Sequence, residues 1–288
     1  MVTKRAKKKR LTRFAIISCV LLLALAATAY VAFDTGLSVT KFSIISEKFP
    51  AEFDGFKIVQ LTDLHCAYFG EKQQELSEII DSLSPDLVVF TGDMIDENIL
   101  DFDCVEELCA VLSAKYPILS VWGNHDRWLA KTDFKKMVDI YEKYGVETLC
   151  GNNITLERNG AQVIISGADD PASWGSKDLN FVMENGIGVS PTENEYNILL
   201  YHRANIFPCL STLGYDLVLA GHMHGGQIRI PFAGGLVSPT GDYFPDYTAG
   251  KYQKNGTTMI VGRGLGNAVD VPRIFNPPEV VLITLRSK

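Results

Sequence analysis

Ile58-Val59-Gln60-Leu61-Thr62-Asp63-Leu64-His65 joins a short apolar run to two side chains that favour metal ions. Residues 58–61 have the length and composition of a buried strand, and Asp63 and His65 come directly after it. Apolar residues at helical spacing follow, namely Leu76, Ile79, Ile80 and Leu83. The segment therefore predicts a strand, a polar motif at its end, and a helix, in that order.

The same order occurs twice more. Leu87–Thr91 reads as a strand that ends at Gly92-Asp93, and Ile118–Trp122 reads as one that ends at Gly123-Asn124-His125-Asp126. A helix follows each of these two strands. Thr132 is the expected cap of the helix that follows Ile118–Trp122. Three such units predict a largely parallel sheet with helices on its face, in which ligands collect beyond the carboxyl ends of the strands.

The second half of the chain is predicted to add a second sheet packed on the first. Asn159-Gly160 between two apolar runs is a hairpin signal. The expected strands are Ile154–Leu156, Gln162–Ile165, Asn197–Tyr201, Leu217–Ala220, Gln227–Ile230, Thr258–Val261 and Val280–Leu285. We expect one α/β domain over residues 56–288, a two-sheet β-sandwich flanked by helices. Residues 34–55 form a connector with an entry strand near Phe42–Ile45.

Residues 14–33 are twenty uncharged, mostly apolar residues, enough for a helix of about 30 Å, the thickness of a hydrocarbon core. Residues 1–13 carry seven Lys/Arg and no acid, which marks a cytoplasmic flank. The pattern favours an uncleaved transmembrane signal anchor, with a signal peptide cut after Ala27-Thr28-Ala29 and a buried core helix as alternatives. Under the first two readings residues 34–288 are extracytoplasmic, and the anchor makes this a single-pass protein of the cell membrane.

Composition narrows the class of partner. The chain has 288 residues, of which 47% are hydrophobic, and a net charge of −7. Beyond residue 13, 20 basic residues face 34 acidic ones, a net charge of −14. Such an acidic domain is a poor binder of nucleic acid polymers.

All five histidines lie in short clusters of polar residues and glycines. Imidazole nitrogens with carboxylate and amide oxygens suit Zn, Mn or Fe ions. The candidate ligands outnumber those that one tetrahedral site can use. The clusters follow in the order Asp-x-His, Gly-Asp-x-x-Asp, Gly-Asn-His-Asp, a lone His202 after an apolar strand, and Gly-His-x-His. Over residues 56–285 this series resembles the calcineurin-like metallophosphoesterases. Gly221–Gln227, Tyr247–Gly250 and Arg263–Gly266 are similar to the membrane-associated bacterial branch of that family.

The resemblance implies two divalent metal ions that share one carboxylate. One ion would be held by Asp63, His65, Asp93 and His224. The other would be held by Asp93, Asn124, His202 and His222. Asp93 is the implied bridge because a carboxylate has two oxygens to share. A hydroxide between the ions would attack phosphorus.

The resemblance also assigns His125 to the leaving-group oxygen, with Asp96 orienting it. Asp126 reads equally as a cap or a catalyst. Arg203 and Arg263 are either phosphate contacts or structural ion pairs, and the stretch Phe232–Tyr252 is either a substrate lip or an ordinary loop.

The sequence thus predicts a metal-dependent phosphoesterase or phosphodiesterase acting on an envelope-associated substrate, such as a lipid head group or a cell-wall polymer. Two alternatives stay open. One is a nucleotide phosphodiesterase, and the other is a metal-binding scaffold without turnover.

Overall fold

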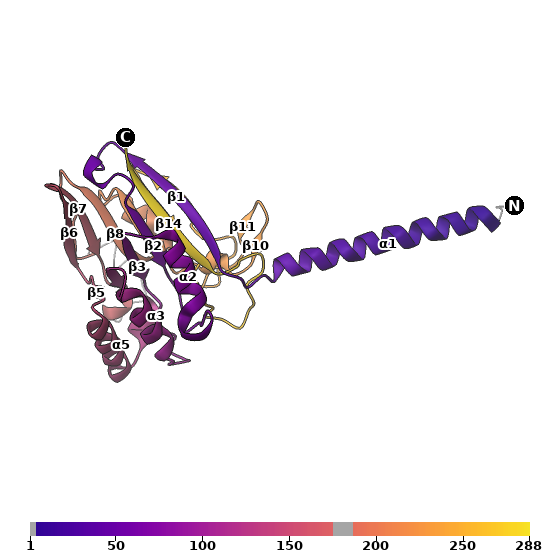
Figure 1. The fold of residues 1–288 in the computed structure, drawn as a ribbon, viewed down its shortest axis with the longest axis horizontal. Coiled ribbons are helices and arrows are strands. Elements are labelled where there is room, and N and C mark those ends of the chain that lie inside the picture. The colour runs from indigo at the N-terminus through magenta and orange to yellow at the C-terminus, as the bar shows by residue number, and fades with distance from the viewer. Residues whose placement is uncertain (1–3, 175–186) are drawn as a thin grey trace.

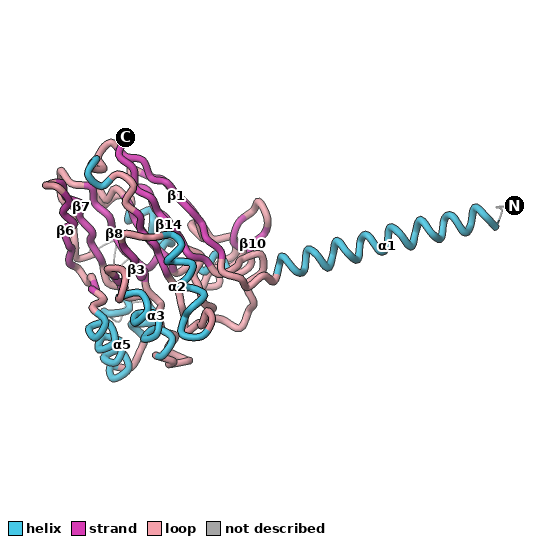
Figure 2. Tube along the Cα trace, in the orientation of Figure 1, coloured by secondary structure: helices cyan, strands magenta, loops and turns pink. Residues whose placement is uncertain are grey.

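Two six-stranded sheets form the centre of the molecule, in a computed structural model that describes residues 4–174 and 187–288. Helices cover the outer faces of the sheets, and one long helix, α1, projects away from the domain (Figure 1). Figure 2 shows the strands gathered in the middle of the domain with helices at its side. The predicted two-sheet sandwich flanked by helices is confirmed.

The first sheet carries the three predicted strand–motif–helix units. In spatial order its strands are β1 (Ser38–Ser46), β14 (Glu279–Ser287), β2 (Lys57–Leu61), β3 (Leu87–Thr91), β4 (Ile118–Val121) and β5 (Glu147–Thr148). The strands from β2 to β5 are parallel, so their carboxyl ends meet at one edge. β14 runs parallel to β1 and antiparallel to β2.

The second sheet consists of β12 (Gly250–Lys254), β13 (Thr257–Val261), β9 (Leu217–Gly221), β8 (Tyr196–Arg203), β7 (Ala161–Gly167) and β6 (Asn152–Arg158), in that spatial order. Asn159 and Gly160 have φ angles of 52° and 84°, as a tight hairpin between β6 and β7 requires.

Two of the predicted strands lie elsewhere than expected. The predicted strand Val280–Leu285 is part of β14 and belongs to the first sheet. The predicted strand Gln227–Ile230 shrinks to β10 (Arg229–Ile230), which pairs only with β11 (Gly234–Gly235) in a separate ribbon. An apolar run marks a strand but does not specify its partner, which is why both placements were wrong.

A helix follows each of β2, β3 and β4, as predicted. The helices are α1 (Lys4–Ala32), α2 (Gln74–Leu83), α3 (Asp103–Ser113), α4 (Asn124–Trp128), α5 (Lys131–Tyr144) and α7 (Phe207–Leu210), with short 3₁₀ turns at residues 51–53, 71–73, 171–174, 204–206 and 224–226. Thr132 was expected to cap α5, but the helix begins at Lys131 and Ala130 is the cap residue. The predicted cap is therefore wrong.

An apolar layer between the sheets holds the strands in place. Ile58, Val89 and Leu119 of the first sheet and Ile198 and Leu219 of the second belong to this buried layer. A second apolar layer lies between the first sheet and α2, α3 and α5. Each buried aliphatic side chain contributes about 1.5–3 kcal/mol. The strand ends, and the residues that follow them, are therefore held on a rigid frame.

The N-terminal helix stands apart from this core. Lys9–Ala32 is the one segment among the described residues that is long and apolar enough to cross a membrane, and its most apolar window is not buried in the domain. Its 24 residues span about 36 Å. The exposure rules out the alternative of a buried core helix and supports the predicted transmembrane helix.

Candidate metal centre

The seven predicted metal ligands converge at the carboxyl ends of five strands. Asp63 follows β2, Asp93 follows β3, and Asn124 follows β4. From the second sheet, His222 and His224 follow β9, and His202 lies within β8. The sequence had placed His202 just after its strand, but β8 continues to Arg203. All seven side chains are buried, so this edge gathers the full set from residues 63 to 224.

Five of the seven predicted ligands have a left-handed backbone. The φ angles are 51° at Asp63, 43° at His65, 54° at Asp93, 74° at His222 and 46° at His224. For residues other than glycine this conformation costs on the order of 1–3 kcal/mol and persists where the surroundings impose it. Such strain is concentrated at functional sites, where it aims side chains in directions that regular strands do not allow.

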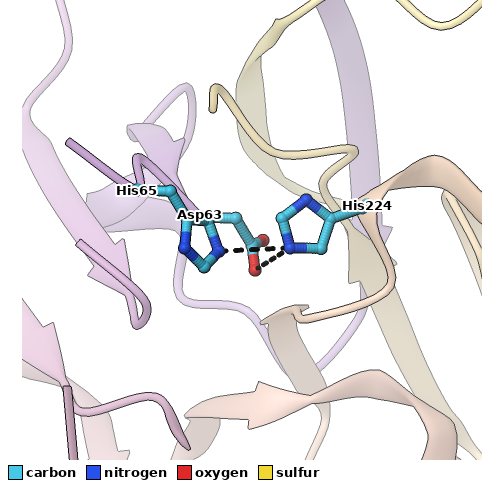
Figure 3. Close-up of side chains that lie close together, drawn as sticks. All are labelled: Asp63, His65 and His224. Carbon is cyan, nitrogen blue, oxygen red and sulfur yellow. Dashed lines mark hydrogen bonds and ion pairs between the residues drawn. The ribbon is translucent and has the colours of Figure 1, made fainter. Parts of the chain in front are cut away.

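The first group of side chains comprises Asp63, His65 and His224, which point toward one another in Figure 3. Nε2 of His65 lies 3.2 Å from Nε2 of His224. That nitrogen of His224 lies 3.6 Å from Oδ1 of Asp63. The backbone N–H of His222 donates to both oxygens of Asp63 at 3.1 Å, which fixes the carboxylate.

The second group centres on His202. Its Nδ1 donates to the backbone oxygen of Thr91 at 2.8 Å, so the neutral ring presents a lone pair at Nε2. This Nε2 lies 3.1 Å from Oδ2 of Asp93 and 3.1 Å from Oδ1 of Asn124. It also lies 3.1 Å from Nδ1 of His222.

Lone pairs at such distances repel each other unless a proton or a cation lies among them. Burial alone would lower the pKa of His202, but the Asp93 carboxylate raises it to about 9. Burial alone would raise the pKa of Asp93, but His202 and the other nearby imidazoles hold it well below its ordinary value. The group thus needs positive charge at its centre. Its nitrogen and oxygen donors fit a divalent transition-metal ion.

Asp93 lies between the two groups. Its Oδ2 is 3.7 Å from Nε2 of His65 and 3.1 Å from Nε2 of His202. The same oxygen is buried and has no hydrogen-bond partner, whereas Oδ1 accepts the backbone N–H of His125 at 2.8 Å. An orphaned carboxylate oxygen between two donor clusters is what a shared metal ligand requires.

Asp126 holds this loop in place. Its carboxylate accepts backbone N–H groups from Gly123 and Asp93 at 2.8 Å, and from Met94 and Ile95 at 3.1 and 3.2 Å. Burial, with the nearby Asp93, raises the pKa of Asp126 to about 6. Of the two interpretations left open by the sequence, these contacts fit the cap.

His125 stands at the border of the site, with its ring 4.6 Å from that of His65 and 4.9 Å from that of Trp128. Asp96, its expected partner, lies 3.7 Å from Nδ1 of His125 and closer, at 3.3 Å, to Nδ1 of His65. Glu97 is the nearer partner, because its Oε2 lies 2.5 Å from Nδ1 of His125. Sequence reasoning missed Glu97, although it directly follows Asp96.

The contacts of Arg203 and Arg263 fit one of the two alternatives that the sequence left open. Arg203 makes two hydrogen bonds to buried Asp170, at 2.6 and 3.0 Å, and Arg263 pairs with Glu279 at 3.0 Å. Both are structural ion pairs. Arg273, which the sequence analysis did not single out, places Nη2 3.3 Å from Nδ1 of His224, and burial lowers its pKa to about 10. No motif surrounds Arg273 in the sequence.

A cavity of about 320 Å³ opens beside the predicted metal ligands. Asp93, His125, His222 and His224 line its polar side. Its other lining residues are mainly apolar, namely Ile228, Val237, Pro239, Ala268, Val269 and Val271. Residues 237–241 come from the stretch Phe232–Tyr252, so part of that stretch does border the site, whereas Gly250–Tyr252 begins strand β12.

A sandwich with histidines and carboxylates clustered at one strand edge fits a metal-dependent hydrolase, such as one that acts on phosphoric esters. The model of the calcineurin-like phosphoesterase family matches residues 56–226. The chain belongs to this family.

Named relatives agree with that assignment. The uncharacterized metallophosphoesterase YkuE of Bacillus subtilis is 33% identical over 257 residues, which cover 87% of this chain and 86% of the relative. Phosphodiesterase YaeI of Escherichia coli is 29% identical over 240 residues, covering 80% and 82%. Among solved structures, a dimetal phosphatase from Danio rerio is 12% identical, with a TM-score of 0.41 and coverage of 74% and 88%.

Proposed function

We propose that the chain is a membrane-anchored phosphoester hydrolase with a dinuclear metal centre that acts outside the cytoplasm. The observation that carries the proposal is the position of Asp93 Oδ2. This oxygen is buried, lacks a hydrogen bond and lies between the donor groups around His65 and His202. Two separate groups with one shared carboxylate favour two ions over one.

Each ion would take four ligands from this chain. One set is Asp63, His65, Asp93 and His224, and the other is Asp93, Asn124, His202 and His222. Bound Mn, Zn or Fe would supply Lewis acidity, which neutralises phosphate oxygens and lowers the pKa of a water molecule.

The chain's own residues complete the chemistry. Glu97 faces Nδ1 of His125 and so leaves the other ring nitrogen for the cavity that His125 lines. His125 would give a proton to the departing alcohol oxygen as the bond from that oxygen to phosphorus breaks. A water oxygen forms the new bond to phosphorus and releases a proton to solvent. Asp96, close to His65, would orient that ligand.

The partner is a phosphoester of the cell envelope, such as a lipid head group or a wall-linked polymer. The domain's net charge of −14 beyond residue 13 disfavours polymeric nucleic acid. His125 and its acidic partner disfavour a scaffold without turnover, because a scaffold does not need a proton donor.

Metal analysis of the full chain purified in detergent tests the centre. We expect about two divalent ions per chain, as paired sites in phosphoesterases hold, and hydrolysis of bis(p-nitrophenyl) phosphate that stops when the metals are chelated. A single ion per chain would contradict the dinuclear proposal. Hydrolysis that survives complete metal removal would contradict the mechanism.

Protease added to intact cells tests the topology. The basic flank 1–13 and the apolar helix predict that protease reaches residues 34–288 while residues 1–13 stay protected. Cells broken before the protease is added serve as the control, in which both segments are cut. Cleavage of the domain only after lysis would overturn the orientation.

A further inference from the structure

The membrane helix ends close to the metal centre. The backbone oxygen of Ala32, the last residue of α1, accepts the N–H of Phe275 at 2.7 Å. The next residue, Asn276, donates from Nδ2 to the backbone oxygen of His224 at 2.7 Å. Only Phe275 and Asn276 therefore separate the end of α1 from a predicted ligand. The ribbon β10–β11 lies beside the same end of the domain in Figure 1.

Exposed apolar side chains gather in the loops near this end. We call six of them the apolar rim: Ile230, Phe232, Tyr243, Phe244, Val269 and Val271. They make up half of the exposed large apolar side chains that the described chain carries beyond Phe33. Phe232 is fully exposed in the turn between β10 and β11, and residues 230–241 contain no charged side chain.

The rim is continuous with the wall of the metal-site cavity. Val269 and Val271 belong to both, since they line the cavity and are nearly half exposed. Val237, another lining residue, forms a bridge with Tyr243 of the rim. The cavity that holds His125 and His224 therefore opens past apolar side chains toward the end of the domain where α1 leaves.

A contiguous apolar patch on a water-exposed surface marks an interaction site. The continuity with α1 identifies the occupant, because a bilayer crossed by Lys9–Ala32 has its surface at residues 32–34, beside the β10–β11 ribbon. Residues 230–241 carry no charge, which fits insertion between acyl chains. The exposed side chains of Asp242 and Asp270, adjacent to rim residues, are acidic, so the rim does not fit attraction to anionic head groups.

We propose that the apolar rim inserts into the leaflet next to the catalytic domain, and that the cavity receives phosphoesters of amphiphiles whose apolar part stays along the rim. This proposal rests on the proposed function for its chemistry and orientation. It narrows the substrate from any envelope phosphoester to one embedded in the lipid.

Fluorescence quenching tests the insertion independently of catalysis. The full chain is reconstituted in phosphatidylcholine vesicles with plain or bromine-bearing acyl chains. Phe232→Trp places a reporter on the rim. Ile45→Trp is the matched control, because Ile45 is 64% exposed and lies near the end of β1, a strand that leads away from α1 (Figure 1).

An inserted reporter is quenched about twofold by brominated lipid, beyond the wild-type background, because interfacial side chains reach the acyl boundary. The control should match the wild type. Equal quenching of both variants, or none at Phe232→Trp, overturns the proposal. The proposal is also overturned if the reporter is not quenched and the particle mass is twice that of one chain, provided that Phe232→Glu restores the single-chain mass. The rim would then contact a second copy of the chain.

Hydrolysis tests the substrate class. The double variant Phe232→Glu with Phe244→Glu should cleave soluble bis(p-nitrophenyl) phosphate at the wild-type rate. Its rate on p-nitrophenyl hexadecyl phosphate embedded in the vesicles should fall about tenfold, because charged side chains resist insertion. Ile45→Glu should hydrolyse both esters at the wild-type rate.

The two substrates separate the two proposals. If the wild type cleaves neither ester although it retains its metals, the proposed function fails, while the quenching result still decides insertion. If the wild type cleaves both and the double variant loses nothing on the embedded ester, insertion of the rim is not needed, and the substrate class is overturned.

Discussion

The inter-sheet layer and the strand edge beyond it follow opposite rules. In the layer around Leu219 and Val89 the clustered side chains are apolar and buried, and most of them lie on regular strands. At the edge, Asp63 and Asp93 are just as buried, but they are polar and have left-handed backbones. Asp93 even retains an oxygen without a hydrogen bond. The layer supplies the stability, and the edge uses it to hold side chains in positions that they would not adopt alone.

Asp93→Ala should have the largest effect on metal binding and hydrolysis. Removal of the shared carboxylate takes a ligand from both proposed ions, so metal content should fall at both positions and hydrolysis should fall below detection. Metal analysis and activity measured on the same samples check this outcome. Asp216→Ala, at a carboxylate paired with Lys48 away from the site, is the control. A variant that keeps two tightly bound ions would disprove the bridge.

His125→Ala should separate chemistry from metal binding. General acid assistance is worth about 10²–10⁴-fold, so turnover of alkyl esters should fall by that factor while both ions stay bound. Activated aryl esters, whose departing oxygen needs little proton, should lose less. An equal loss on both ester types, or a parallel loss of metal, would remove His125 from the role of acid.

Glu97→Gln tests whether Glu97, rather than Asp96, positions His125. Glu97 lies 2.5 Å from His125, and Asp96 lies nearer to His65. We expect Glu97→Gln to lower turnover of alkyl esters about tenfold with metal affinity unchanged. Asp96→Asn should weaken metal affinity about 10–100-fold, as changes to the partner of a ligating histidine do. Competition with a chelator and initial rates measure the two effects, and the reverse pattern would exchange their roles.

Leu219→Ala should affect activity least. The side chain is fully buried between the sheets, so its truncation should lower the free energy of unfolding by about 2–5 kcal/mol. The activity of the folded, metal-loaded fraction should stay at the wild-type value. Denaturant titration checks the stability, with Ile45→Ala on the exposed surface as the control, expected to stay within about 0.5 kcal/mol. A loss of activity per folded molecule would show that the layer and the edge are coupled.

Most of the fold was predictable because local pattern and burial agree. Leu87–Thr91 is a run of apolar residues between Pro85-Asp86 and Gly92, and β3 has those bounds. The position of β14 was not predictable, because a strand buried on both faces carries no mark of its neighbour. The cap of α5 was predicted wrongly because Thr132 has a suitable side chain but lies two residues after the cap position, Ala130.

The site shows the same division. The seven predicted ligands lie close together, as their positions at strand ends implied, because parallel strands bring their carboxyl ends to one edge. Asp96 and Glu97 are adjacent, and the path of the loop after β3 decides which of them faces His125. No sequence periodicity predicts that path. Arg273 lies 49 residues from His224, and only the closure of the chain brings the two together.

β14 gives the domain a constraint on its folding. The strand lies between β1 and β2, so residues 279–287 complete a sheet in which the paired residues of β1 were synthesised 241 residues earlier. Until they arrive, β1 has no neighbour and β2 has an open edge, which is a template for pairing with other chains. The first sheet is therefore complete only once residues 279–287 are available. The proposed membrane tether at α1 would keep neighbouring chains at one surface during this interval, so the speed at which the sheet is completed would decide whether strand edges pair within a molecule or between molecules.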